Sequence, residues 1–421
     1  MGRVVIVGAG IIGLAAAREL RRSGADVLLL DRGQPGASAS SGNAGWIVPS
    51  YSAPLPAPGL MRTSARWLLR HDSPLYLRPR LDRSALLWLA RFAWACRPAP
   101  YATGLDALAQ LNAHTMDLFD ELRADGVTYE MHEDGLLFAG LTMAAVHDAA
   151  QGLQFLERFG YPRIDILNGH ALRAIEPALS DNVAGGFHIS NERHVRPETL
   201  TAGLCAWLIE HCVEVRTGLT VWSVRRNGQS GLTVETDAGA FNADQVLIAA
   251  GAWSGELLKA SGVHLPVEAG KGYSVTWDAP TSQLRGPVDL IEAHVACTPF
   301  AGALRLAGTM ELSGLNERLV PARVEAVRRA GRQYFRQPLD GAFEQVWVGV
   351  RPLLPDGLPA IGAVRGFENL FVATGHGMLG VTLAPATAVA IAGMMTRQES
   401  SASLVSFDPN RFSRHLRFHR R

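Results

Sequence analysis

The chain has 421 residues, which is enough for two or three domains with large buried cores. Apolar residues make up 48 % and charged residues 19 % of it, a composition typical of an ordered globular protein. Lys plus Arg number 40 and Asp plus Glu number 39, so the chain has no general basic field and nucleic acid is not expected as a partner. Its four scattered cysteines lack C-x-x-C spacing, which argues against zinc, iron–sulfur clusters and a disulfide framework. We therefore expect no metal and reduced thiols in a cytoplasmic protein.

The first predicted elements are a buried strand, a Gly-rich turn, a helix and a second buried strand over residues 4–31. The turn follows the pattern G-x-G-x-x-G and consists of Gly8, Ala9, Gly10, Ile11, Ile12 and Gly13. The first glycine permits a tight turn, the second lets a pyrophosphate approach the backbone, and the third lets the helix pack on the strand. Asp31 ends the second strand, where a carboxylate accepts from both ribose hydroxyls and repels a 2′-phosphate. This pattern favours FAD or NAD over NADP, and the alternative is a Gly-rich turn of some other α/β protein.

Two irregular segments come next. Residues 33–46 are rich in small and polar residues, which predicts a loop whose backbone lies against a ligand; the alternative is a mobile surface loop. Residues 51–100 are rich in Pro, Arg and Trp, and the prolines break this segment into short elements.

The rest of the chain alternates predicted helices and strands. Helices are predicted over 105–125, 143–160, 197–211 and 320–336, and strands over 213–216, 220–225, 232–236, 243–251 and 370–374. Alternating apolar residues in 263–348 predict a mostly antiparallel sheet, and the strand at 370–374 runs into a Gly-rich turn followed by an apolar helix. The fold class is therefore α/β, with a discontinuous Rossmann-like domain (1–50, 160–262 and 345–400). A second, α+β substrate domain is expected from 51–159 and 263–344, and a C-terminal tail from 401–421, with the basic run 411–421 frayed.

Two apolar segments have a composition that also occurs in membrane or export segments. Residues 4–17 are not interpreted as a signal peptide, because their glycines fall at nucleotide-binding positions. Residues 378–395 contain Pro385 and several small residues, which favours a buried helix over a membrane span. Both interpretations are consistent with the expected cytoplasmic location.

Motifs along nearly the whole chain resemble those of the D-amino-acid oxidase superfamily of FAD-dependent amine oxidoreductases, which includes glycine oxidase. They are the Gly-rich turn with Asp31, the loop 41–45, and the segments 347–352, 355–362 and 373–382. Segments 50–54, 57–59 and 271–274 and the Arg/Trp-rich stretch narrow the resemblance to the bacterial D-amino-acid dehydrogenase branch. The chain departs from the pattern at Lys271, where Arg is common, and at Val381, where Trp is frequent.

The resemblance implies FAD as the cofactor and a set of residues that bind it. Matching the ADP-binding segment are Gly8, Ala9, Gly10, Ile11, Ile12, Gly13, Asp31 and Arg32. Matching the loop beside the pyrophosphate and flavin are Ser41, Gly42, Asn43, Ala44 and Gly45, and matching the adenine and second nucleotide contacts are Val221, Ala250, Gly251 and Trp253. Matching the turn at the flavin's pyrimidine end are Gly375, His376, Gly377, Met378, Leu379, Gly380 and Thr382, together with Arg351. Because no motif places Cys297 at the flavin, we expect the FAD to be non-covalent.

The resemblance also implies oxidation of an amino acid to an imine and then a 2-oxo acid, by hydride transfer from the α-carbon to the flavin. Arg351 is expected to bind the substrate carboxylate, and the alternative is a structural ion pair. Tyr273 offers a hydroxyl to the substrate or merely ends a strand. His376 contacts the flavin or poises the amine, or is a turn histidine satisfied by backbone. Tyr51 is expected to cover the ring face.

The leading functional hypothesis is a dehydrogenase of D-amino acids, D-proline and D-hydroxyproline included, that passes electrons to a quinone or another non-oxygen acceptor. An O₂-dependent oxidase of glycine, sarcosine or another secondary amine is the alternative, and a non-catalytic flavoprotein is the third. Two interpretations of Trp67, Trp88 and Trp94 stay open. They lie in the core of the substrate domain among solvated arginines, or they form an amphipathic surface for peripheral contact with the inner face of the membrane.

Overall fold

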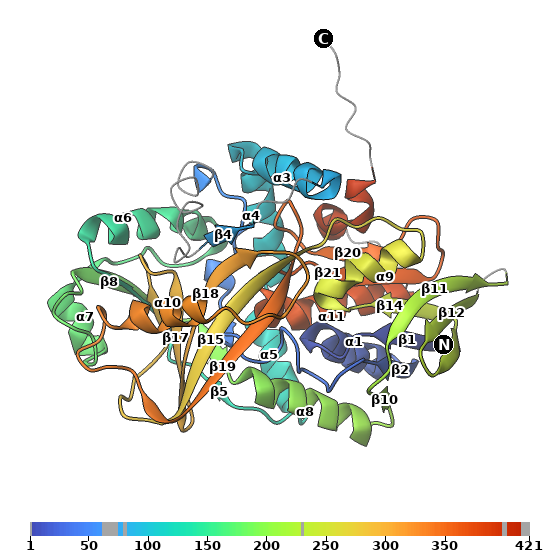
Figure 1. Ribbon diagram of the computed structural model, residues 1–421, viewed down its shortest axis with the longest axis horizontal. Coiled ribbons are helices and arrows are strands. Elements are labelled where there is room, and N and C mark those ends of the chain that lie inside the picture. Colours follow the sequence, from blue (N-terminus) through green and yellow to red (C-terminus); the bar gives the residue numbers. More distant parts are fainter. Residues whose placement is uncertain (1, 61–74, 79–81, 229–230, 398–401, 414–421) are drawn as a thin grey trace, which may run out of the picture.

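The computed structural model describes residues 2–60, 75–78, 82–228, 231–397 and 402–413 (Figure 1). Its six-stranded sheet has four apolar strands, buried on both faces, at its centre. In spatial order its strands are β10 (Glu214–Arg216), β2 (Asp26–Leu30), β1 (Arg3–Val7), β14 (Gln245–Ile248), β21 (Leu370–Thr374) and β20 (Ala360–Ala363). All neighbours are parallel except β20, which is antiparallel to β21. Near-continuous apolar runs such as 4–7 and 27–30 are typical of parallel strands covered on both sides.

Helices cover this sheet and bury their apolar faces against it (Figure 1). They are α1 (Ile11–Arg22), α4 (Pro98–Asn112), α5 (Thr115–Ala124), α8 (Pro197–Glu210), α9 (Ser254–Ala260) and α11 (Gly380–Arg397). Prolines occupy the first turn of α4 and α8, where a missing N–H leaves no hydrogen bond unmade. None of the described helices, α11 included, is both long and apolar enough to cross a membrane.

A nine-stranded, mainly antiparallel sheet forms the other half of the molecule (Figure 1). In spatial order its strands are β19 (Gly341–Leu353), β15 (Glu268–Pro280), β18 (Ala303–Leu312), β17 (Val295–Phe300), β16 (Val288–Leu290), β6 (Leu136–Gly140), β8 (Gly185–Ile189) and β7 (Leu167–Asn168), with β4 (Leu75–Leu77) paired to β18. Helix α10 (Pro321–Gly331) packs on β15, β17 and β18 and covers one face. The opposite face is left to line the cavity described below.

The remaining elements lie outside these two sheets. They are the three-stranded sheet β11 (Val221–Asn227), β12 (Gly231–Thr236) and β13 (Gly239–Ala243), the small sheet β3 (Trp46–Ile47), β9 (Arg193–Val195) and β5 (Met131–His132), and the helices α3 (Arg83–Ala95), α6 (Met143–Gly152) and α7 (Gly169–Ile175). Short 3₁₀ helices lie at Pro49–Tyr51, Gln154–Phe159, Gly251–Trp253, Ala402–Phe407 and Pro409–Phe412. In α3, the Asp82 carboxylate accepts from the Ala85 amide at 2.9 Å and caps the helix.

The α/β class and most predicted elements are confirmed, including the helix of 197–210 and the antiparallel sheet of 268–353. The domain boundaries stay a prediction. Three segments pack with a different part of the molecule from the one that those boundaries give them: β7 with β8, α4 with α5, and the C-terminal segment. Strands β7 and β8 hydrogen-bond in the nine-stranded sheet, although 160–262 was expected in the nucleotide-binding domain. Helices α4 and α5 pack on α11 and join the core over the parallel sheet, because their apolar faces complete it.

The C-terminal segment also differs from the expected frayed tail. Residues 402–413 fold back onto the body, and Phe407 is fully buried in the core beside α11. The Arg411 guanidinium pairs with the Asp356 carboxylate at 2.7 Å and also donates to the Leu358 carbonyl. A buried aromatic ring and a two-point ion pair therefore hold a segment whose composition alone predicted fraying. The final basic residues, 414–421, lie outside the described residues.

Candidate active site

A continuous cavity of about 1090 Å³ runs between the two large sheets. One end is lined by the Gly-rich turn after β1, and the other by β16, β17, β18 and the end of β19. Pockets for drug-sized ligands span roughly 300 to 1,000 Å³. The cavity is therefore large enough for a dinucleotide together with a small substrate.

The Gly-rich turn has the close approaches that its glycines predict. Gly8 has φ +111°, and a Cβ there would meet the Ala249 carbonyl oxygen at 2.4 Å. A Cβ on Gly13 would lie 1.8 Å from the Gly8 carbonyl oxygen, so only glycine lets α1 begin this close to β1. Over Gly10 the nearest atom is the Ser40 hydroxyl oxygen at 3.2 Å, which leaves room for a phosphate beside the α1 N-terminus. These residues fit a bound pyrophosphate.

The nucleoside part of the cavity is bounded by four predicted side chains. The Asp31 carboxylate accepts from the Ala9 amide at 2.6 Å and the Gly33 amide at 2.7 Å, which fixes the acid beside the turn. The Arg32 guanidinium stacks over the Trp253 ring, 3.7 Å from its centroid. Val221, at the start of β11, lines the cavity next to them.

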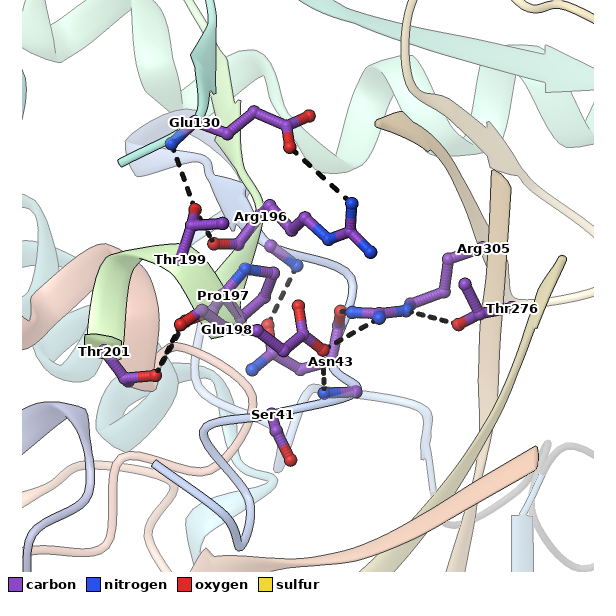
Figure 2. A network of polar contacts seen from close by, with 12 residues as sticks. Ser41, Asn43, Glu130, Arg196, Pro197, Glu198, Thr199, Thr201, Thr276 and Arg305 are labelled. Carbon is purple, nitrogen blue, oxygen red and sulfur yellow. Dashed lines mark hydrogen bonds and ion pairs between the residues drawn. The ribbon is translucent and has the colours of Figure 1, made fainter. Parts of the chain in front are cut away.

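The loop 41–45 is held by a polar network that the sequence did not predict (Figure 2). The Glu198 carboxylate, in the first turn of α8, accepts from the Gly42 amide at 2.9 Å and from the Arg305 guanidinium at 2.8 Å. Arg305 also donates to the Asn43 carbonyl and to the Thr276 hydroxyl, each at 2.8 Å. Burial alone would raise the pKa of Glu198, but Arg305 and the Gly42 amide outweigh it and lower this pKa. The network fixes the loop between α8 and β18.

Trp347 explains two further glycines of the predicted motifs. A Cβ on Gly42 would lie 2.3 Å from the Trp347 ring, and one on Gly349 would lie 2.0 Å from it. The ring therefore lies against both glycines, where the loop meets β19, and it lines the cavity.

The C-terminal turn brings α11 to the same cavity. His376 is buried, and its Nε2 is hydrogen-bonded to the Thr387 hydroxyl at 3.0 Å. Burial lowers the pKa of His376 to about 3, so the ring is neutral at ordinary pH. The Thr382 hydroxyl donates to the Trp46 carbonyl at 3.0 Å and accepts from the Val48 amide, so this residue ties α11 to β3.

Arg351, near the end of β19, places its guanidinium across the neighbouring strand. A Cβ on Gly272 would lie 2.2–2.4 Å from the guanidinium atoms, so the arginine occupies the space that this glycine leaves. Its Nη1 donates to the Thr309 carbonyl at 2.9 Å. No carboxylate among the described residues pairs with Arg351, and burial lowers its pKa to about 10. The alternative of a structural ion pair therefore has no partner in the described part of the chain.

Tyr273 does not fit the expected contact with substrate. Adjacent residues of a strand face opposite sides of the sheet, so Tyr273 points away from Gly272 and the Arg351 guanidinium. Its ring is fully buried in the core that contains α10, and its hydroxyl donates to the Glu311 carboxylate at 2.7 Å. Lys271 pairs with the same carboxylate at 2.9 Å, so the two side chains serve one buried cluster beneath the cavity floor.

Tyr51 lies at the apolar end of the cavity beside a carboxyl group that the sequence analysis missed. Its hydroxyl lies beside the Asp289 carboxyl group of β16, and its ring packs edge-on against Phe138 at 5.3 Å. Asp289 is only 6 % exposed, and burial raises its pKa to about 7. The pKa of Tyr51 is held well above its usual range, first by the negative charge of Asp289 and second by burial. Tyr51 lines the cavity, and 41 % of the residue is exposed there. A lone Asp within a short apolar strand gave no sequence pattern to find it by.

Most predicted site residues line this one cavity, and a few support it from behind. Those that line it are Gly8, Gly10, Ile11, Ile12, Asp31, Arg32, Gly42, Asn43, Ala44, Gly45, Tyr51, Val221, Ala250, Gly251, Trp253, Tyr273 (whose side chain points away), Arg351, His376, Gly377, Met378, Leu379 and Gly380. Those that do not are Ala9, Gly13, Ser41, Gly375 and Thr382. The Ser41 hydroxyl donates back to the Ala37 and Ser38 carbonyls, whereas the neighbouring Ser40 hydroxyl accepts from the Ile11 amide at 2.9 Å inside the cavity.

One group outside the cavity has metal-ligating side chains, namely His132, Asp134 and His194. The two imidazole rings stack 4.6 Å apart and within 9° of parallel. A ring nitrogen offers its lone pair in the plane of the ring, so lone pairs of stacked rings do not converge on one ion. This arrangement does not favour a metal centre.

A parallel sheet with a Gly-rich turn faces an antiparallel sheet that carries the buried Arg351, and together they define a dinucleotide-binding enzyme fold. Comparison with known proteins specifies it. The profile of the FAD dependent oxidoreductase family matches residues 3–394, so the chain belongs to this family. Its cofactor is FAD, and non-covalent binding is typical of the family. Cys297 alternates with the cavity-lining Ala296 on β17 and is buried on the opposite face of the sheet.

Individual relatives agree with this assignment. D-amino acid dehydrogenase of Cereibacter sphaeroides is 33 % identical over 395 residues, which cover 92 % of this chain and 90 % of that protein. Glycine oxidase from Geobacillus kaustophilus superposes with a TM-score of 0.78 at 25 % identity, covering 98 % of this chain and 99 % of that one. L-α-Glycerophosphate oxidase from Mycoplasma pneumoniae, a structure with FAD bound, shares the fold with a TM-score of 0.73 at 16 % identity, covering 94 % and 95 %.

Proposed function

We propose that this protein is an FAD-dependent dehydrogenase that deaminates D-amino acids oxidatively and passes the electrons to a quinone or another non-oxygen acceptor. The observation that carries the proposal is the Arg351 guanidinium, which lies at the cavity without a carboxylate partner among the described residues. The similarity to D-amino acid dehydrogenase of Cereibacter sphaeroides supports the choice of substrate.

Arg351 supplies what an amino-acid carboxylate requires. A guanidinium offers a planar pair of donors, and charge-assisted hydrogen bonds are stronger when water is excluded. The Thr309 carbonyl holds one Nη1 hydrogen, which leaves the other outward donors for a ligand. The substrate is therefore anchored by its carboxylate beside the apolar end of the cavity.

The remaining roles follow from position. Bound FAD would accept the hydride from the substrate α-carbon, and the residues named above for the dinucleotide would hold it. The N-terminus of α11 favours negative charge at the pyrimidine end of the ring. His376 stays neutral, so it contributes packing and orientation rather than charge. Tyr51 covers the far end of the site, and its hydroxyl lies beside Asp289.

Anaerobic bleaching of the flavin absorbance tests the reaction. We expect D-amino acids, including D-alanine and D-proline, to bleach it rapidly, and their L-enantiomers to leave it oxidised. Bleaching by glycine and sarcosine alone would favour the secondary-amine oxidase. Failure of every amine would leave a non-catalytic flavoprotein.

The electron acceptor is proposed from the two faces of α3. Trp88, Leu89 and Phe92 line the cavity from its inner face, and the Trp88 ring N–H donates to the Pro266 carbonyl at 3.1 Å. The outer face exposes Leu86 and Trp94 by 51 % and 55 %. The expectation that all three tryptophans are core is therefore correct for Trp88 and wrong for Trp94, and Trp67 lies outside the described residues.

This outer face fits peripheral contact with the inner face of the membrane. Arg97 stacks over the Trp94 ring at 4.5 Å, and exposed Leu87 extends the apolar patch. Tryptophan, leucine and arginine together are typical of segments at a lipid interface. One helix then separates the lipid from the cavity, which gives an apolar quinone a short route to it.

Two measurements test this acceptor. Turnover with a soluble quinone should exceed turnover in air, and the protein should float with anionic vesicles. Trp94→Ala should weaken flotation while leaving anaerobic bleaching unchanged. Stoichiometric peroxide without vesicle binding would reject the dehydrogenase and favour the oxidase.

A further inference from the structure

The inference concerns Asp289, a buried carboxyl group facing the apolar end of the cavity. The Tyr51 hydroxyl lies beside it, and no Lys or Arg among the described residues is ion-paired with it. An ionised carboxylate taken out of water is costly unless it meets a cation or several donors. Lining the cavity at 6 % exposure, Asp289 is available to a group that enters from it.

Strand register places Asp289 on the same face of the nine-stranded sheet as Arg351. One row of directly paired residues crosses the sheet through Trp347, Ser274, Ala307, Ala296 and Asp289. Paired residues share a face, and side chains along a strand alternate, so Arg351 shares the face of Trp347. Arg351 and Asp289 therefore lie on the same face of the sheet, which lines the cavity, on the well-separated strands β19 and β16.

The distance between the two groups follows from the same register. Arg351 donates to the Thr309 carbonyl on β18. Strand β18 is two strands away from β16, which carries Asp289, and Thr309 is two residues along β18 from Ala307, the β18 member of the row. With strand spacings of about 4.8 Å and about 3.4 Å per residue, Thr309 and Asp289 are about 12 Å apart. Between them the cavity floor carries the methyl groups of Ala296 and Ala307 and the backbone of Gly308, and His294 lines the cavity beside Ala296.

We propose that Asp289, with the Tyr51 hydroxyl beside it, binds the cationic end of a substrate side chain, so that the preferred substrates are D-amino acids of the lysine and arginine type. This proposal rests on the proposed function and specifies its substrate class. Arg351 takes the carboxylate at one end, and Asp289 takes the ammonium or guanidinium at the other.

Substrate length supports the side chain over the α-amine as the partner of Asp289. An extended lysine spans about 7 Å from its carboxylate to its terminal nitrogen, and a hydrogen bond of about 2.9 Å at each end brings the span to about 13 Å. Through the α-amine, the same two hydrogen bonds span only about 9 Å. The small side chains of Ala296 and Ala307 and the backbone of Gly308 leave a track for the connecting methylenes, with the cavity-lining His294 at its side.

The test compares D-lysine with D-norleucine, which has the same carbon chain without the ammonium. Anaerobic flavin reduction by the holoenzyme gives kcat/KM for each substrate. We expect D-lysine to be preferred about 10- to 100-fold, the range of one buried charge-assisted hydrogen bond. Asp289→Asn should abolish the preference by slowing D-lysine and not D-norleucine, whereas Asp148→Asn, an exposed carboxylate on α6, should leave it unchanged.

Each outcome separates this proposal from the proposed function. Equal rates for D-lysine and D-norleucine in the unmodified enzyme would overturn the side-chain site and leave D-amino acid oxidation standing, even if the variant failed to fold. An equal loss for both substrates in Asp289→Asn, with FAD still bound, would place Asp289 at the α-amine and also overturn it. If no D-amino acid bleaches the flavin, the proposed function itself fails.

Discussion

Replacing Gly272 by alanine tests whether the position of the Arg351 guanidinium controls substrate binding. The added Cβ would lie 2.2–2.4 Å from the guanidinium atoms, whereas unstrained contacts of this kind are about 3.5–4.0 Å long. The guanidinium must therefore move by more than about 1 Å, and a displacement of about 1 Å in a positioning group costs up to about 100-fold in rate. We expect kcat/KM for a D-amino acid to fall about 10- to 100-fold, mostly through KM.

The fold should tolerate this change, because the displaced atoms are the far end of a flexible side chain. Thermal unfolding and the flavin absorbance spectrum should stay near those of the unmodified protein. Gly152→Ala is the matched control, since a Cβ at that position in α6 meets nothing within 4 Å. Anaerobic stopped-flow reduction of the flavin measures the effect. An unchanged KM in Gly272→Ala, with FAD bound, would refute the role given to the Arg351 position.

Three further predictions concern the arginine, the cofactor and stability. Arg351→Lys should raise KM strongly and Arg351→Ala more so, by about 2–4 kcal/mol in kcat/KM, and intact kinetics would make Arg351 structural. Acid or heat precipitation should release FAD into the supernatant, and flavin retained in the pellet would contradict non-covalent binding. Arg305→Met should weaken FAD binding about tenfold by freeing loop 41–45, and an unchanged FAD affinity would contradict the role of Arg305. Burial raises the pKa of Glu192 to about 7. Between about pH 4.5 and 7 the folded state therefore keeps a proton that the unfolded state has lost. The free energy of unfolding should fall as pH rises through this range, by up to about 3 kcal/mol. Glu192→Gln should remove this decline in urea unfolding measured at pH 5 and pH 7.5, and equal slopes in both proteins would contradict it.

The parts of the site that could be predicted from sequence are those built from neighbouring residues. The turn at Gly8–Gly13 depends on backbone geometry and on glycine spacing within one βαβ unit, so its pattern is complete in the sequence. Asp289 and Tyr51 are 238 positions apart in the chain and meet only through the strand order of the larger sheet. No local pattern records such a contact.

The wrong prediction for Tyr273 and the missed contacts of loop 41–45 also arise because strand register and distant contacts are not recorded in local sequence. Tyr273 and Gly272 are adjacent, so whichever of them faces the cavity is decided by the register of β15 and not by residue type. A tyrosine beside a family motif suggested a hydroxyl for substrate, but the alternation of the strand sends that hydroxyl to Glu311. Likewise, nothing in the sequence near 42–45 indicates that Glu198 and Arg305 hold this loop.

The order of strands in the parallel sheet has a consequence for synthesis of the chain. Strand β1 is made first, yet its neighbour β14 needs β21, residues 370–374, on its other side. Until residues 370–374 have been synthesised, the edge of β14 stays open, and α1 lacks its contacts with α11 until residues 380–397 follow. An open, apolar strand edge is a site of aberrant pairing. Shortened chains that end before residue 370 should therefore aggregate although the Gly-rich turn is intact. A chaperone that shields the edge of β14 would be needed until β21 has been synthesised.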